Sequence, residues 1–176
     1  REEYLADKRG RKVTILYPQR GDKRKLVEMA TENAVQSFRV RYDQMQRKER
    51  VLLELQVRLR LRHVPRRIEC FDISNIHGTN AVGSMVRFLD GAPDKKGYRR
   101  YRIRTVDSTL GGDDFAMMHE VLQRRLGKGR DGNDLPDLIV VDGGKGQLGI
   151  AVAAMHQLGI EQVDVIGLAK MRVERS

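Results

Sequence analysis

Apolar residues recur along this chain with two periods that predict different elements. From Asp22 to about Arg62 they follow helical spacing without an intervening Pro or Gly, and Asp22 can cap the start. We therefore predict one long helix there. Pro65 breaks it, although the alternation of Leu and Arg near its end also fits a strand. Ahead of the helix, the run Val13–Tyr17 predicts a short strand.

The middle of the chain has the alternation and turn residues typical of a β-meander. Gly and Asn between residues 75 and 80 predict one turn, and Asp90–Asp94 predicts a hairpin. Such short links favour antiparallel neighbours. The three predicted strands are Ile68–Ile73, Ala81–Leu89 and Tyr98–Val106.

The last third alternates helices and strands, which predicts parallel strands joined by helical crossovers. The order is a helix (Asp114–Leu126), a Gly-rich loop (Gly127–Pro136), a strand (Leu138–Val141), a helix (Gly146–Leu158) and a strand (Val163–Leu168). Three antiparallel strands, followed by two parallel strands with crossover helices, form a mixed α/β domain with the connectivity of the RNase H-like fold. We expect this domain at 67–176, after a basic, largely helical segment at 1–66.

Charge separates these two parts of the chain. The net charge is +10. Residues 1–68 hold 19 Lys and Arg against 9 Asp and Glu, whereas the remainder holds 15 of each. A basic segment joined to a neutral domain suggests a polyanionic partner, with a solvated helix surface as the alternative. Arg20, Lys23, Arg24 and Lys25 are the candidate phosphate contacts in this segment.

Other features of the composition bear on compartment. No apolar run approaches the ~20 residues that a membrane span needs. The chain opens without a cleavable leader pattern, and its single Cys70 excludes an internal disulfide. These features predict a protein of a reducing compartment, the cytoplasm.

Three acids stand at junctions where a fold can gather them around a hard divalent cation. Asp72 lies within the apolar run 68–74, and Asp142 closes the apolar run 138–141. Asp114 precedes the helix that starts there. Since a buried carboxylate is costly unless it is paired or binds a cation, a metal site is the leading interpretation.

Each acid also has a plainer explanation. Asp72 can accept hydrogen bonds from nearby backbone amides, and an Asp-Gly-Gly sequence such as the one at Asp142 is a common turn. Asp113 and Asp114 can cap a helix, and the sequence barely separates the capping residue from the one that faces a metal. The four histidines show no zinc spacing with a cysteine.

Basic residues accompany the acids. In an alternating strand, Arg100, Arg102 and Arg104 share one face, which suits either phosphate contact or plain solvation. Lys145 stands among Gly143, Gly144 and Gly146, where a backbone can approach phosphate closely. The pattern is not a Walker A loop, because Gln147 follows Gly146.

Five ordered motifs resemble the C-terminal half of UvrC, the nuclease subunit of bacterial UvrABC excision repair. The match runs along nearly the whole chain. The motifs are Pro18–Lys23 (PQRGDK), Glu69–Asn75 (ECFDISN), Gly112–Met118 (GDDFAMM), Val141–Gln147 (VDGGKGQ) and Gly167–Lys170 (GLAK).

The resemblance implies an RNase H-like endonuclease that makes the incision 5′ of a lesion in double-stranded DNA. It implies that Asp72, Asp114 and Asp142 are the catalytic, metal-linked acids and that Mg²⁺ or Mn²⁺ is the cofactor. One ion and two ions both remain open. UvrB is the implied partner, through parts outside this chain.

The family also uses a histidine downstream of the Gly-Leu-Ala-Lys segment, and a helix-hairpin-helix module. Neither occurs before Ser176. We therefore expect these 176 residues on their own to be a poor nuclease. Two other functions remain open: an ATPase or phosphotransferase on the same fold, and a non-catalytic DNA-binding scaffold whose acids only satisfy turns.

Overall fold

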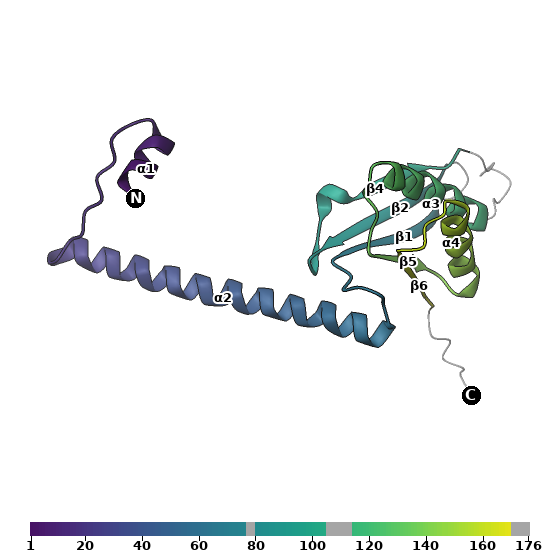
Figure 1. Ribbon diagram of the computed structural model, residues 1–176, viewed down its shortest axis with the longest axis horizontal. Helices are drawn as coiled ribbons and strands as arrows, with labels where there is room; N and C mark the ends of the chain where they lie inside the picture. Colours follow the sequence, from purple (N-terminus) through teal and green to yellow (C-terminus); the bar gives the residue numbers. More distant parts are fainter. Residues whose placement is uncertain (77–79, 105–113, 170–176) are drawn as a thin grey trace. The chain divides into compact units, whose positions relative to one another are not determined.

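The computed structural model describes residues 1–76, 80–104 and 114–169 (Figure 1). The chain forms two compact units, Arg1–Gln46 and Arg47–Ser176. The expected division at residue 66 therefore falls inside the second unit, and it stays a prediction about domains. None of the described helices is both long enough and apolar enough to cross a membrane.

The first unit is helical. It contains α1 (Glu2–Arg9) and most of α2 (Gly21–Leu59), which agrees with the predicted long helix. The strand predicted at Val13–Tyr17 is wrong, because these residues have no regular structure. A strand needs a partner for its backbone, whereas the N–H of Ile15 donates to Glu2 Oε1 at 2.7 Å.

A mixed sheet organises the second unit. Its order is β3-β2-β1-β5-β6, with β4 also paired to β2. The early pairs are antiparallel and the two pairs involving β5 are parallel, which confirms the predicted order. The strands are β1 (Arg67–Ile76), β2 (Asn80–Leu89), β3 (Ala92–Pro93), β4 (Arg99–Arg102), β5 (Leu138–Asp142) and β6 (Asp164–Leu168).

Three strands differ in length from their predictions. β1 and β2 extend into the predicted turn, and residues 77–79 between them lie outside the described part. β4 ends at Arg102, so Arg104 lies beyond the strand, and Thr105 and Val106 of the predicted strand lie outside the described residues. The backbone N–H of Arg104 instead donates to the carboxylate of Glu120 at 3.0 Å. A 3₁₀ turn, η1 (Lys95–Gly97), precedes β4.

Helices α3 (Asp114–Asp131) and α4 (Lys145–Gln157) lie together against one face of the sheet (Figure 1). Residues 127–131 belong to α3, although they were predicted as a loop. Packing outweighs the low helix propensity of glycine here, because Gly129 is buried. A β-carbon on Gly129 would lie 2.5 Å from Arg125 Nη1 and 2.9 Å from the Asp134 carbonyl oxygen.

Alternation along the strands divides the core. Phe71, Ile139 and Val141 face α3 and α4 and are almost fully buried. Leu138 and Val140 face the other side, where Leu61 covers them just after α2 ends. The sheet therefore has one face packed under two helices, whereas the chain that leaves α2 covers the other face at Leu138 and Val140.

Candidate functional site

Strand register brings Asp72 and Asp142 together. β1 and β5 run parallel, and the last residue pair in register between them is Phe71 and Val141. Asp72 and Asp142 each follow by one residue, still within their strands. Two acids separated by 70 positions in sequence therefore end up at neighbouring positions on adjacent strands.

The two acids also share a face. Because Phe71 and Val141 point toward α3 and α4, alternation turns Asp72 and Asp142 to the opposite side. Both are exposed, so the expectation that Asp72 sits buried within its strand is wrong. Burial cost therefore gives no argument for a cation there. Solvent access instead lets a hydrated cation reach both carboxylates.

Asp114 begins α3 and is exposed. Its neighbour Phe115 reaches the start of α4: a β-carbon on Gly146 would lie 2.7 Å from the Phe115 ring. The two helix starts are thus in contact, and α4 itself begins three residues after Asp142. Asp113 lies outside the described residues, so the choice between Asp113 and Asp114 stays open.

The loop after Asp142 is held against the end of β6. The N–H of Gly143 donates to the carbonyl oxygen of Leu168 at 3.0 Å. A β-carbon on Gly167 would lie 2.7 Å from the carbonyl oxygen of Gly143. This close approach explains why glycine stands at 167. It also fixes the position of the loop that connects β5 to α4.

The donor chemistry suits a hard divalent cation. Carboxylate oxygens are the ligands that Mg²⁺ prefers, usually with several waters retained, and two carboxylates on one open face provide them. Among the described residues, however, no group of three His, Cys, Asp or Glu side chains lies close enough to hold a metal ion. Asp114 therefore does not join Asp72 and Asp142 as a preformed three-residue cluster.

Basic residues extend the same face across the sheet. Ser84 pairs with Asp72 across β1 and β2, and Arg100 pairs with Ser84 across β2 and β4. Directly opposite residues project on one side, so Arg100 lies in the same row as the acid. Arg102, two residues on, shares that side and is also exposed.

The remaining candidate phosphate contacts fall elsewhere. Lys145 is the exposed first residue of α4, beside the Asp142 loop. Arg20 and the cations of the first turns of α2 are exposed and belong to the first unit. Arg24 pairs with Glu28 at 2.8 Å, so part of that charge is already compensated.

Sequence reasoning missed a buried ion pair on the helix-packed side of the sheet, opposite the acids. Glu69 is fully buried, and its Oε1 accepts from Arg125 Nη2 at 2.5 Å. The other carboxylate oxygen, Oε2, is buried without a hydrogen-bond partner among the described residues. Period-two alternation was the available signal, because Glu69 shares the helix-facing side with Phe71.

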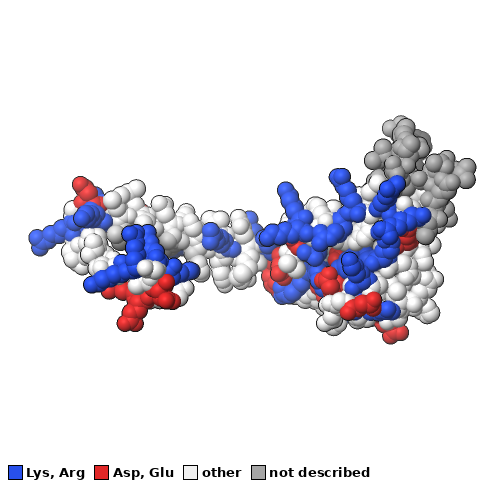
Figure 2. All heavy atoms as spheres, turned by 90° about the horizontal axis from the view of Figure 1, so that it is seen from above, with Lys and Arg blue, Asp and Glu red and all other residues white. Residues whose placement is uncertain are grey.

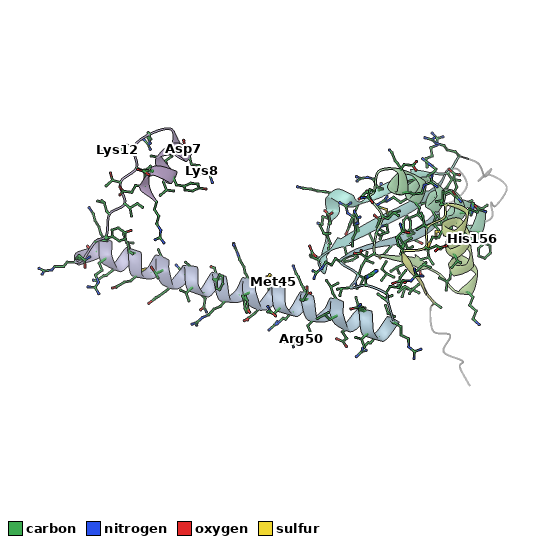
Figure 3. The ribbon with its side chains drawn as sticks, in the orientation of Figure 1. Asp7, Lys8, Lys12, Met45, Arg50 and His156 are labelled. Atoms are coloured by element: carbon green, nitrogen blue, oxygen red, sulfur yellow. The ribbon has the colours of Figure 1, made fainter. Side chains whose placement is uncertain are left out.

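The histidines of the described helices make no metal-like group. His156 projects from α4 and is exposed (Figure 3). His119 lies 3.0 Å from Gln157 Oε1, which links α3 to α4. Both are accounted for as surface or packing residues.

Comparison with known families gives two matches. The family described as "UvrC RNAse H endonuclease domain" matches residues 56–176, and "UvrC Ribonuclease H-like domain" matches residues 1–41. The first match, together with the strand order, confirms the RNase H-like fold of the second unit.

Curated relatives share the name "UvrABC system protein C". The protein of Geobacter metallireducens is 53% identical over 173 residues, covering 98% of this chain and 28% of the relative. That of Protochlamydia amoebophila is 48% identical, covering 96% of this chain and 27% of the relative. The chain thus spans just over a quarter of the length of these relatives.

Solved structures with a likeness include two endonuclease V proteins. The human one is 14% identical, with a TM-score of 0.41 over 62% of this chain and 48% of that chain. The Ciona intestinalis one, in complex with DNA containing inosine, is 20% identical, with a TM-score of 0.43 over 63% and 48%.

Proposed function

The chain belongs to the UvrC family, and on that premise we propose that its second unit hydrolyses a phosphodiester bond of damaged double-stranded DNA. The incision would lie 5′ of the lesion, as part of bacterial nucleotide excision repair. Asp72 and Asp142 hold Mg²⁺ or Mn²⁺ in this proposal, and Asp114 orients or completes the site. UvrB is the proposed partner, through segments of the longer protein outside these 176 residues.

One observation carries the proposal: the register that sets Asp72 and Asp142 side by side on the open face of the sheet. A structural role for a turn explains one such acid but not the pairing of two. A divalent cation bound there would supply charge neutralisation at the scissile phosphate. The two carboxylates would hold the cation in place. Because they lie on the face opposite α3 and α4, DNA can approach them.

Basic side chains in the same row would position the substrate. Arg100 and Arg102 project beside the acids from the edge of the sheet, where a guanidinium can hold a phosphate with two parallel hydrogen bonds. Lys145 would add a point charge next to Asp142. Phosphate contacts of this kind fix the register of the DNA without reading its sequence.

Manganese binding tests the proposal without relying on turnover. Titration of Mn²⁺, followed by water-proton relaxation, should show binding to the unaltered chain. Binding should weaken strongly in Asp72→Asn and in Asp142→Asn, because each change removes a charged ligand. The matched control is Asp131→Asn, an exposed acid at the end of α3. Unchanged Mn²⁺ binding in both site variants would favour the DNA-binding scaffold.

The phosphotransferase alternative has its own test. Nucleotide triphosphate binding in the absence of DNA, lost when the Asp142 loop is altered, would favour it over the nuclease. No observation on the described residues supports a nucleotide pocket at that loop.

A further inference from the structure

A concave site lies on the helix-packed side of the sheet, away from the acids. A cavity of about 280 Å³ opens between β2, β4 and the C-terminal half of α3. Cations from all three elements converge on it, and Tyr101 and Met85 line it as well. The converging cations are Arg87, Arg99, Arg124, Arg125 and Lys128.

Three of these cations are already paired. Arg87 contacts Asp94 at 2.5 Å, and Arg124 contacts Glu120 at 3.0 Å. Arg125 contacts Glu69 and Asp134, and Asp134 is paired with Arg67 too, so that four-residue network is balanced. These carboxylates therefore offset the arginines that they touch.

Two cations are left over. Within the described part of the chain, Arg99 donates hydrogen bonds to the carbonyl oxygens of Lys96 and Tyr98, each at 2.8 Å. Neither Arg99 nor Lys128 has an ion pair within the described part of the chain, and both are exposed. The cavity lining consequently carries an excess of about two positive charges, from the exposed Arg99 and Lys128, in addition to its compensated ion pairs.

The lining suits a phosphate with a short attached group. Guanidinium groups bind phosphate through fixed pairs of N–H donors, and a Lys ammonium adds a compact charge. Burial raises the pKa of the Tyr101 hydroxyl, which therefore stays a neutral donor. This hydroxyl lies 4.0 Å from the sulfur of Met85, a weak acceptor that a phosphate oxygen can replace.

The cavity is connected to the acid face through one edge strand. β4 pairs with β2 alone, so it is an edge of the sheet. Its residues alternate between faces, with Arg100 and Arg102 on the acid side and Arg99 on the cavity side. In the view of Figure 2, Lys and Arg side chains gather on part of the visible face of this unit. A polyanion that crosses the β4 edge therefore meets cations on both sides.

We propose that this cavity binds one backbone phosphate of a nucleic-acid strand that continues around the β4 edge from the acid face. The inference rests on the proposed function, because it extends the path of the same DNA. It assigns Arg99 and Lys128 as the residues that hold the phosphate and Tyr101 as a supporting donor. An acidic peptide would need the same charges but has no reason to follow this edge.

The test measures affinity for a short DNA duplex against salt concentration, in an Asp142→Asn background that prevents cleavage. If Arg99 and Lys128 hold a single phosphate, Arg99→Gln, Lys128→Gln and the double variant should each flatten the slope of log affinity against log salt by about 0.9. A loss of about 1.8 in the double variant would mean two independent phosphate contacts and would overturn the assignment of both residues to one phosphate. Thermal unfolding should be unchanged, because both side chains are exposed.

The matched control removes two exposed arginines from α2, with Arg50→Gln and Arg58→Gln (Figure 3 labels Arg50). An equal loss in this control would mean a general field effect and would overturn the pocket. Unchanged slopes in the pocket variants would overturn it too.

Two further probes distinguish the kinds of anion that the cavity could bind. Inorganic phosphate or polyglutamate is added alone, and the thermal shift of the unaltered chain is compared with that of the double variant. A shift lost in the double variant, with DNA slopes unchanged, would overturn the nucleic-acid assignment in favour of a free anion or an acidic partner. Failure of the nuclease proposal would give a different result. Mn²⁺ binding would be unchanged in the Asp72 and Asp142 variants, while the pocket variants would still flatten the slope of log DNA affinity against log salt.

Discussion

Asp72 and Asp142 lie at neighbouring positions on the adjacent strands β1 and β5, each one residue beyond the registered pair Phe71 and Val141. The relationship follows from the parallel pairing of β1 and β5. The elements between them in the sequence, which include β2, β4 and α3, return the chain to the same end of the sheet and so allow that pairing. It turns both carboxylates away from the helix-packed core. The open face of the sheet is thus the place where a cation and a DNA backbone can meet.

Replacing Asp142 with Asn should remove DNA incision and leave DNA affinity nearly intact. The change takes away a charged ligand but keeps the side-chain shape, and phosphate affinity comes mainly from Lys and Arg. We expect a fall of at least about 10²-fold in single-turnover cleavage, the scale of losing one electrostatic stabiliser. The assay compares cleavage and binding of the same lesion-bearing duplex in the full-length protein. A parallel loss of affinity would mean that Asp142 maintains the fold.

Gly167→Ala should disturb the loop that follows Asp142. Its β-carbon would lie 2.7 Å from the carbonyl oxygen of Gly143, which is backbone and cannot rotate away. Overpacking of this kind costs about 1–3 kcal/mol, measured by urea unfolding. Mn²⁺ affinity should fall as well, because the loop directly follows Asp142.

The matched control for that change is Gly149→Ala. Gly149 lies inside α4, and a β-carbon there meets nothing within 4 Å. Alanine should stabilise the helix by about 0.5–1 kcal/mol relative to glycine. Equal destabilisation by both substitutions would contradict the role given to the Gly167 contact.

Arg125→Met should destabilise the second unit severely. It leaves the fully buried carboxylate of Glu69 without its guanidinium, a loss of about 3–5 kcal/mol. The double variant Glu69→Leu with Arg125→Met should recover most of that loss, since an apolar pair of similar volume is often tolerated. Urea unfolding of the four proteins gives the coupling energy. Additive losses would show that the two side chains act separately.

Cys70 should be slow to alkylate. Burial, and secondarily the negative charge of Glu69, raise the pKa of the Cys70 thiol. Less thiolate is therefore present at a given alkaline pH, and the rate profile with iodoacetamide should shift to higher pH than in the urea-unfolded chain. Because the pKa of this thiol is higher in the folded chain than in the unfolded chain, its protonation favours folding. That contribution to stability is fully present below the unfolded pKa and is lost as pH rises through the folded pKa. A profile matching the unfolded chain would contradict the burial.

Much of the architecture could be predicted because local patterns decide it. Period-two alternation marks β1 and β2, and helical spacing without Pro or Gly marks α2, since side-chain direction follows directly from backbone geometry. Short turns require antiparallel neighbours, and helical crossovers require parallel ones. That is why the strand order, and with it the pairing of the runs that carry Asp72 and Asp142, could be read from the residues.

Non-local contacts decided the rest. Val13–Tyr17 has strand-forming residues but no partner strand, and residues 127–131 continue α3 because Gly129 fits where a larger side chain would strike Arg125. The same holds for the buried pair of Glu69 and Arg125, which lie 56 positions apart. Alternation alone says that Glu69 faces inward, but only the packing of α3 on β1 supplies its cation. The sequence by itself determined which residues point to which face, whereas tertiary structure determined what each of them meets there, because burial and pairing depend on surfaces contributed by distant segments.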